Sequence, residues 1–219
     1  MWPQTGRYIY KAMNIQISED YNLPDSEMLR SGNSYKGLMV WVPENLMVVV
    51  GKGSDPTEEL MSENIMLDHV PVIRRGTGGC AVVLSPDMAV VSFIVENDTD
   101  KKQNEYFREF VNAIINALKK IGIENIEMKG ISDIAINGLK VAGSSIFRSK
   151  DFVFFHSIIN IAGNTRPMER YLKFPPRQPD YRMNRSHKDF VTSFKEQGCE
   201  IDIHEFEENL KAEWLLRFV

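Results

Sequence analysis

The order of strand-like and helical stretches most constrains what this chain can fold into. Three apolar runs follow one another after residue 70, and three more come after a long helical pattern. They are PVIRR, CAVVL and MAVVSFIV before the helix, and SDIAING, LKVAGSSIFR and FVFFHSIINI after it. The Asn137-Gly138 pair between two of the later runs is a strong signal for a β-hairpin. Strands that follow one another so directly do not fit a regular alternation of strand and helix.

The helical pattern covers residues 102–121. Its apolar residues recur three and four positions apart, which is typical of an amphipathic helix with one face on the core. These residues are Phe107, Phe110, Val111, Ile114, Ile115, Leu118 and Ile121. Four further elements are expected from turn and capping signals: a β-hairpin over 36–50 and helices over 56–67, 187–197 and 204–216.

These elements predict an α+β fold in which helices flank a mixed, largely antiparallel β-sheet. The chain has 219 residues, a length that suits one domain. We expect a core over about 10–165, followed by a basic and helical segment over 166–219.

Composition excludes several classes of protein. Hydrophobic residues make up 43% and charged residues 26%, and the formal net charge of −4 argues against a general nucleic-acid binder. Cys80 and Cys199 are too few and too far apart for a disulfide framework or a zinc site. No apolar run approaches the roughly 20 residues of a membrane span, and the N-terminus lacks the layout of a signal peptide. We therefore expect a cytoplasmic protein that binds neither nucleic acid nor membrane.

Basic residues nevertheless gather in one segment, 166–188, while acidic residues concentrate at 196–208. The basic ones are Arg166, Arg170, Lys173, Arg177, Arg182, Arg185 and Lys188. A local basic face suits a small anionic ligand or an acidic partner. A solvated surface with scattered charge explains the composition equally well.

The stretch RRGTGGCAVVL, residues 74–84, places Arg74 and Arg75 directly before a loop with three glycines. Glycine lets a backbone approach a ligand closely, and successive N–H groups can then form a nest for a phosphate or carboxylate. A simple turn between two strands remains the alternative.

A lysine stands at the start of an apolar strand in INGLKVAGSS. Strict strand alternation would put Lys140 on one face with Ala142 and Ser144, and Gly143 on the other. A cation beside small residues could hold a carboxylate and a phosphate together, although a lysine at a hairpin end often lies in solvent.

Two more polar residues interrupt apolar patterns. Asp133, at the start of the preceding strand, could hold Mg²⁺ with a nucleotide phosphate or could terminate the turn. His156 interrupts an apolar strand, where a hydrogen-bonded core histidine and a ligand-binding one are both open.

Taken in order, RRGTGGCAVVLSPD, GISDIAINGLKVAGSS and FFHSIIN resemble the motifs of the lipoate-protein ligase family. That family belongs with octanoyltransferases and biotin ligases in one superfamily. The resemblance runs from about residue 36 to 165. It implies a biotin/lipoate-protein ligase-like fold and a single catalytic domain over 1–219 without a C-terminal accessory domain.

The resemblance also implies an activity. Lipoate or octanoate would be activated by ATP, with Mg²⁺ as its companion ion, to an acyl-adenylate and then transferred to a lysine of an acceptor domain. ATP and lipoate would be substrates, and no tightly bound cofactor is expected. The family's acceptors are lipoyl domains, on E2 subunits of 2-oxoacid dehydrogenases or on the H-type carrier of glycine cleavage. A separate small accessory subunit could assist, as in split family members.

Residue roles follow from the same resemblance. Lys140 would be catalytic, bridging the carboxylate and the α-phosphate, and Asp133 would be a candidate Mg²⁺ ligand. The nucleotide or acyl-adenylate would be bound by Arg75, Gly78, Gly79, Cys80, Ala81, Val82, Val83 and Lys140. The lipoyl group would be bound by Trp41, Arg74, Gly79, Lys140, Gly143 and His156.

Two alternatives stay open, and the first follows from a departure from the family pattern at Cys80, where a third glycine is usual. A thiol beside Arg75 could act as the nucleophile of an octanoyl or lipoyl transferase that forms a thioester. The chain could also be a non-catalytic subunit that binds a lipoyl-type ligand.

Overall fold

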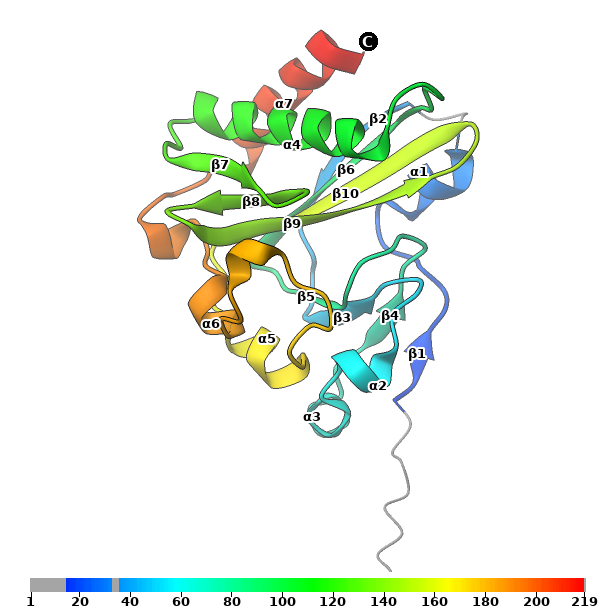
Figure 1. Ribbon diagram of the computed structural model, residues 1–219, viewed down its shortest axis with the longest axis vertical. Helices are drawn as coiled ribbons and strands as arrows, with labels where there is room; N and C mark the ends of the chain where they lie inside the picture. Colours follow the sequence, from blue (N-terminus) through cyan, green and yellow to red (C-terminus); the bar gives the residue numbers. More distant parts are fainter. Residues whose placement is uncertain (1–14, 33–35, 219) are drawn as a thin grey trace, which may run out of the picture.

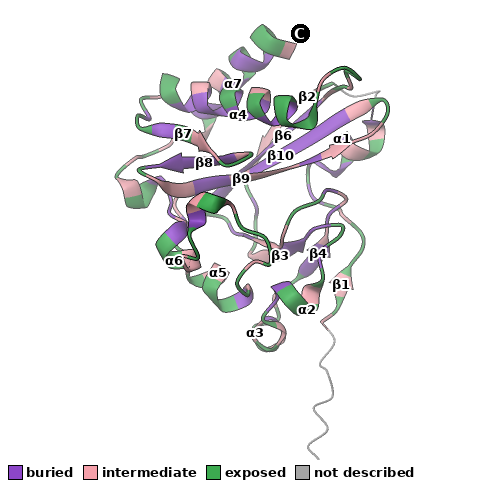
Figure 2. Cartoon of the chain, in the orientation of Figure 1, coloured by how far each residue is buried: buried purple, intermediate pink, exposed green. Residues whose placement is uncertain are grey.

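A six-stranded antiparallel sheet forms the larger layer of the computed structural model, which describes residues 15–32 and 36–218 (Figure 1). Its strand order is β2-β6-β10-β9-β8-β7. The strands are β2 (Gly37–Trp41), β6 (Met88–Glu96), β10 (Phe152–Asn160), β9 (Leu139–Arg148), β8 (Asp133–Ile136) and β7 (Ile126–Lys129). Figure 2 shows that β6, β8 and β10 are the most buried of these, as expected for strands covered on both faces.

A smaller sheet lies beside the larger one and contains four strands in the order β1-β4-β3-β5. They are β1 (Ile17–Ser18), β4 (Val72–Arg74), β3 (Met47–Val50) and β5 (Val82–Leu84). β4 pairs in parallel with both β1 and β3, whereas β5 is antiparallel to β3. The predicted α+β class with mixed, largely antiparallel pairing is therefore confirmed, although the strands divide between two sheets.

Two long helices cover one face of the larger sheet (Figure 1). They are α4 (Gln103–Lys120), which confirms the helix predicted over 102–121, and α7 (Ile203–Phe218), which confirms the one over 204–216. The ring centroid of Phe110 on α4 lies 5.2 Å from that of Phe93 and 5.0 Å from that of Phe155. The ring centroid of Trp214 on α7 lies 5.4 Å from that of Phe93. Aromatic contacts thus bind both helices to the sheet.

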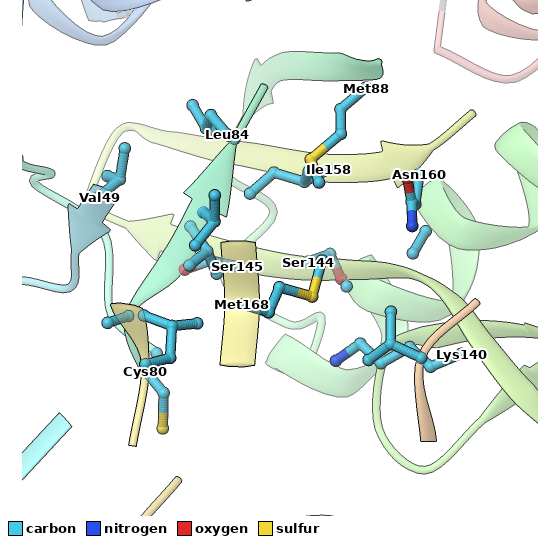
Figure 3. Close-up of a pocket in the computed structure, with 18 of the residues that line it drawn as sticks. Val49, Cys80, Leu84, Met88, Lys140, Ser144, Ser145, Ile158, Asn160 and Met168 are labelled. Carbon is cyan, nitrogen blue, oxygen red and sulfur yellow. The ribbon is translucent and has the colours of Figure 1, made fainter. Parts of the chain in front are cut away.

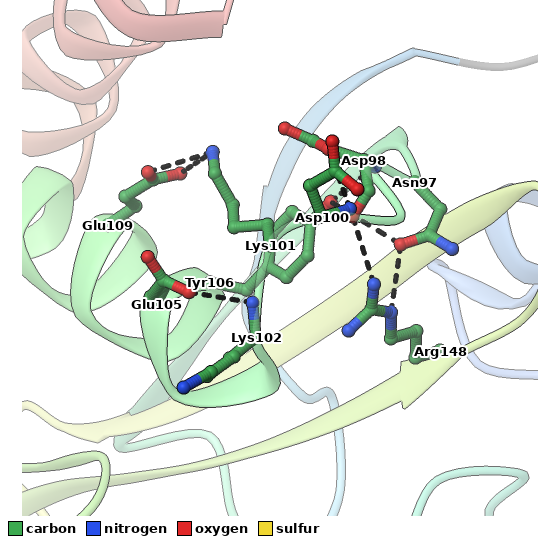
Figure 4. Close-up of polar contacts among 9 residues, drawn as sticks. All are labelled: Asn97, Asp98, Asp100, Lys101, Lys102, Glu105, Tyr106, Glu109 and Arg148. Atoms are coloured by element: carbon green, nitrogen blue, oxygen red, sulfur yellow. Dashed lines mark hydrogen bonds and ion pairs between the residues drawn. The ribbon is translucent and has the colours of Figure 1, made fainter.

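The turn before α4 is fixed by a polar network (Figure 4). Arg148 on β9 donates to the side-chain oxygen of Asn97 at 2.8 Å and to the carbonyl of Asp98 at 2.9 Å. The N–H of Asp98 donates to the hydroxyl of Tyr106 at 2.6 Å. The network joins the strand before α4 to the first turns of the helix, so that the helix begins in a defined direction.

The prediction of a β-hairpin over 36–50 is wrong. β2 pairs with β6 in the larger sheet, whereas β3 pairs with β4 and β5 in the smaller one. The turn at 43–45 carries the chain from one sheet to the other, because each strand finds its hydrogen-bond partners elsewhere.

Two of the helices expected from the sequence are each replaced by two shorter elements. Residues 56–67 form α2 (Pro56–Glu59) and α3 (Ser62–Leu67), because Leu60 is extended and bridges to Leu172. Residues 187–197 form α6 (His187–Phe190) and a 3₁₀ turn (Lys195–Gln197), because Val191 is extended and bridges to Lys140.

The remaining elements are α1 (Ser26–Ser31), α5 (Arg166–Tyr171) and a 3₁₀ turn (Asp180–Arg182). α5 and α6 lie on the opposite side of the larger sheet from α4 and α7 (Figure 1). The single-domain assignment for 1–219 stays a prediction, and its residues 1–14, 33–35 and 219 lie outside the described part. Among the described residues, no helix has the length and apolar character needed to cross a membrane.

We expect Phe110→Ala to lower the free energy of unfolding by about 3–5 kcal/mol, because it removes a fully buried ring and leaves a cavity. Urea denaturation followed by circular dichroism measures the change. Leu216→Ala is the control, since Leu216 is 78% exposed on α7 and its truncation should change stability by less than about 0.5 kcal/mol. Equal effects of the two substitutions would contradict the aromatic core.

Candidate active site

A cavity of about 280 Å³ lies where the smaller sheet, β9, β10 and the segment 168–191 meet. Figure 3 shows Val49 and Leu84 on one side of it and Lys140 on the other. The apolar side includes Leu23, Val49, Leu84, Val90 and Ile158, which pack with Trp41. The cationic side includes Lys140 and Arg182, with the His187 ring beside them. The cavity therefore suits a molecule with an apolar tail and an anionic head.

The buried side chain of Arg75 holds the glycine loop in its shape by donating hydrogen bonds to backbone carbonyls of the loop. Its guanidinium donates to the carbonyl of Gly78 at 2.7 and 3.1 Å, to that of Cys80 at 2.9 Å and to that of Val49 at 3.3 Å. Burial lowers the pKa of Arg75 to about 10, which leaves it charged at neutral pH. Backbone carbonyls thus engage most of its donors, so Arg75 contributes to a ligand site chiefly by holding the loop.

Two glycines make the loop geometry possible. Gly79 has a φ of +91°, in the region that favours glycine. A Cβ on Gly51 would lie 2.0 Å from the carbonyl oxygen of Gly79, so the two backbones meet at van der Waals distance only because Gly51 has no side chain. Ser54 and Ser145 donate to the carbonyls of Gly79 and Gly78 at 3.1 and 2.7 Å.

Lys140 lies in the same cavity as residues 79–83, which end the glycine loop and begin β5, as the sequence motifs predict. Its Nζ is 2.7 Å from Oδ1 of Asp133, whose Oδ2 accepts a hydrogen bond from Tyr181 at 2.8 Å. This pairing fixes the ammonium at the end of a flexible side chain. The backbone beyond it is also held, because the N–H of Thr192 donates to the carbonyl of Lys140 at 2.9 Å.

The expected strict alternation along β9 is wrong at Lys140. A bulge shifts the register between β8 and β9, so Lys140 faces Ala135 while Ala142 faces Ile134. Gly143, and not Ala142, therefore lies beneath the lysine: a Cβ there would be 2.8 Å from Cε and Nζ. Gly143 lines the cavity and makes room for the ammonium group.

The carboxylate of Asp133 is the predicted Mg²⁺ ligand. Both carboxylate oxygens already have partners, Lys140 and Tyr181. Within residues 15–32 and 36–218, no group of three or more His, Cys, Asp or Glu side chains is placed to hold a metal ion. These residues do not fit a resident metal, and a contact of Asp133 with Mg²⁺ stays a prediction.

His156 belongs to a buried polar network that links the two sheets. Its Nε2 lies 2.9 Å from the hydroxyl of Thr77 in the glycine loop, and its Nδ1 lies 3.7 Å from Asp25. Asp25 also accepts hydrogen bonds from Tyr21 at 2.7 Å and Ser92 at 2.6 Å. Sequence reasoning missed Asp25, because a lone acid before a short helix carries no distinctive pattern.

The surroundings of His156 and Asp25 shift the pKa values of both groups. Burial lowers the pKa of His156, which favours the neutral ring at neutral pH. Burial alone would raise the pKa of Asp25, but the neighbouring His156 and the hydrogen bonds from Ser92 and Tyr21 outweigh it and the pKa is lowered. His156 lines the cavity, so it is both a hydrogen-bonded core histidine and a wall residue; its contact with lipoate stays a prediction.

The structure does not bring every predicted site residue to the cavity. Arg74 points elsewhere, donating to Glu19 at 3.0 Å and to the carbonyl of Gly51 at 3.0 Å, and it does not line the cavity. Gly78 also lies outside the lining and acts through its carbonyl. The N–H of Ala81, expected to face a ligand, donates to the buried carboxylate of Glu59.

Trp41, Arg75, Gly79, Cys80, Val82 and Val83 line the cavity, and so does Ala81 although its N–H is turned to Glu59. Cys80 is half-buried, with its Sγ 4.0 Å from the carbonyl of Arg177. The basic segment contributes three residues that sequence reasoning did not single out. Arg182 and His187 line the cavity, and Tyr181 donates a hydrogen bond to Asp133. Burial, with Arg182 and Lys140 nearby, lowers the pKa of His187 to about 4, so its ring is neutral at neutral pH.

A sequence profile of the lipoyl protein ligase A/B catalytic domain matches residues 22–215. The chain belongs to this family. Lipoate-protein ligase LplJ of Bacillus subtilis is 31% identical over 112 residues, and lipoate-protein ligase 1 of Staphylococcus aureus is 29% identical over 129. These matches cover 51% and 59% of this chain but only 33% and 38% of the relatives, so the chain spans well under half their length.

Solved structures show the same fold at lower identity. One is a bipartite lipoate protein ligase with its E2 lipoyl domain from Thermoplasma acidophilum, with a TM-score of 0.72 and 20% identity. It matches 87% of this chain and 74% of that one. A lipoate-protein ligase A bound with ATP has a TM-score of 0.70 and 17% identity, over 92% of this chain and 84% of the other. The family indicated by the three motifs is confirmed by the sequence profile, and the fold it implies is confirmed by these structures.

We expect Gly51→Ala to lower the free energy of unfolding by roughly 1–3 kcal/mol, because its new methyl group forces the Gly79 backbone aside. Gly53→Ala is the matched control, since no heavy atom lies within 4 Å of a Cβ there. Urea denaturation of both variants measures the difference. If Gly51→Ala were as stable as Gly53→Ala, the close approach of the two backbones would not hold in solution.

Proposed function

We propose that this protein is a lipoate-protein ligase that activates lipoate or octanoate with ATP. The observation that carries the proposal is the single cavity in which an apolar wall, the glycine loop and Lys140 meet. Membership of the family and the ATP-bound and lipoic-acid-bound structures of related proteins support it. A cytoplasmic location also remains part of the proposal.

The first step joins the acid to the nucleotide. A carboxylate oxygen attacks the α-phosphorus of ATP, the bond between that phosphorus and its β-bridging oxygen breaks, and pyrophosphate leaves. Negative charge gathers around phosphorus in the transition state, where fixed cations and N–H donors stabilise it most. Lys140 supplies the ammonium group, and Asp133 keeps that group in place at 2.7 Å.

The second step transfers the acyl group. The ε-amine of an acceptor lysine attacks the acyl carbonyl, the bond between that carbon and the phosphate oxygen breaks, and AMP leaves as the amine loses a proton. The backbone of residues 79–83 holds the nucleotide part, in the shape that Arg75 gives the loop. The alkyl chain and dithiolane ring lie against Trp41 and its apolar neighbours.

The co-substrates and partners follow from the same chemistry. Mg²⁺ accompanies ATP by binding its phosphates, which suits a chain without a protein-made metal cage among its described residues. The acceptors are lipoyl domains of the E2 or H-carrier type, and the archaeal ligase with its E2 lipoyl domain supports this choice. That related ligase is bipartite, which supports a separate accessory subunit here as well.

A second candidate is a transferase that forms a thioester on Cys80. The observation in its favour is that this half-buried thiol lines the cavity near the glycine loop. A non-catalytic lipoyl-binding subunit is the third candidate. ATP-dependent acceptor modification with AMP release supports the ligase, transfer from an octanoyl carrier without ATP supports the transferase, and neither reaction supports the binding subunit.

We expect Lys140→Ala to reduce acyl-adenylate formation by at least about 10²-fold, because it removes a cation from the transition state. Lipoate-dependent exchange of pyrophosphate into ATP measures this step. Lys129→Ala is the control: that lysine also pairs with a carboxylate, Glu127 at 2.9 Å, but does not line the cavity. Near-normal exchange by a folded Lys140→Ala variant would rule out its assigned role.

We expect Cys80→Ser to keep most of the ATP-dependent activity, because no covalent bond to sulfur forms in the adenylate route. Acceptor mass gain with lipoate and ATP measures it. A complete loss of activity in a folded variant, together with a trapped acyl-protein in the unaltered chain, would favour the thioester route instead.

A further inference from the structure

Arg182 is a buried cation whose hydrogen bonding is incomplete. Its side chain is 5% exposed, and it lines the cavity. Its Nε donates to the carbonyl of Arg185 at 2.9 Å, but its buried Nη2 has no hydrogen-bond partner among the described residues. Burying a charged donor without a hydrogen-bond partner costs more free energy than burying a neutral one. The unpartnered Nη2 therefore calls for a ligand or another explanation.

The guanidinium is held in place without using that donor. The rings of Phe174 and Phe190 lie 4.8 and 4.9 Å from its Cζ, and these contacts restrict the orientation of the planar group. The backbone is fixed as well, because Arg182 ends a 3₁₀ turn that Met183 caps in the left-handed conformation. A preorganised fork of donors is what bidentate recognition of a phosphate or carboxylate requires.

The neighbourhood of Arg182 favours an anion. Arg185 lies close enough to lower the pKa of Arg182, after the larger effect of burial, while Asp133, Tyr181 and Cys80 act in the opposite direction. The carboxylate of Asp133 is already engaged by Lys140 and Tyr181. His187, the nearby titratable group, is neutral at neutral pH. Among the described residues, no carboxylate lies within ion-pair distance of the Arg182 guanidinium, so its charge has no partner of its own.

We propose that the unpartnered Nη2 of the Arg182 guanidinium binds the phosphate of the nucleotide, as a second cation beside Lys140. This inference rests on the proposed function for the identity of the nucleotide, but the phosphate contact itself can be tested without turnover. A phosphate suits the site better than the carboxylate of the acid, because its three terminal oxygens can accept from Lys140 and Arg182 together and leave one for the loop, whereas a carboxylate has only two oxygens.

The test compares AMP with adenosine, which differ only in the phosphate. Calorimetric titration of the full chain gives both dissociation constants for the unaltered protein and for Arg182→Gln. We expect Arg182→Gln to weaken AMP binding by about 10- to 100-fold, the effect of one charge-assisted contact, and to leave adenosine binding unchanged. Arg182→Lys, which keeps the charge but loses the fork, should show a smaller loss of the same kind.

Lys188→Gln is the matched control, since Lys188 is an exposed cation of the same segment that does not line the cavity. Unchanged AMP binding by Arg182→Gln would overturn the proposal. An equal loss for adenosine would also overturn it, because it would assign Arg182 to holding the segment together. Weaker octanoate binding with normal AMP binding would move the contact to the carboxylate, against the proposal.

The outcome is separable from that of the proposed function. Should the unaltered protein make no acyl-adenylate while Arg182→Gln still loses AMP selectively, the phosphate contact stands and the ligase assignment fails. Should the unaltered protein make acyl-adenylate while both Arg182 variants bind AMP normally, the ligase assignment stands and the phosphate contact fails.

Discussion

The site depends on a buried guanidinium that is bound almost entirely by main-chain carbonyls. Arg75 is 4% exposed and joins the glycine loop to β3 through the carbonyls of Gly78, Cys80 and Val49. Taking a cation out of water is costly unless polar partners replace its hydration. The loop must therefore keep its shape for Arg75 to stay buried, and Gly51 lets the loop lie close enough to do so. The rim of the cavity is rigid for this reason.

The functional groups come from two sheets, and polar contacts between the sheets decide how they meet. Apolar packing alone is non-directional, whereas hydrogen bonds fix a relative position. Ser145 on β9 donates to Gly78 in the loop, and Thr77 in the loop contacts His156 on β10. Because His156 and Asp25 are buried within this network, the position of Lys140 relative to the loop is set by groups that need not touch the substrate.

Local sequence patterns predicted the helices and strands better than they predicted which strands pair with one another. Periodicity placed α4 and most strands, and the three motifs predicted that the glycine loop and Lys140 belong to one site. The 36–50 hairpin failed because an apolar run specifies a strand but not which sheet it joins. The bulge beside Lys140 was also invisible, since one extra residue changes which side chain lies beneath another without changing the composition. Nothing in the basic cluster 166–188 distinguished the buried Arg182 from its exposed neighbours.

The two sides of the cavity have different consequences under the proposed activity. Contacts between the apolar wall and the acyl tail are the same before and during the reaction, so they lower KM without raising kcat. Lys140 and the loop meet negative charge that concentrates at phosphorus in the transition state, so they act on kcat as well as on binding. Changes at wall positions such as Val49 or Ile158 can therefore alter which acid is accepted while the chemistry at phosphorus persists. Under the proposed activity, the wall therefore determines which acid binds, and Lys140 acts on whichever acid is bound.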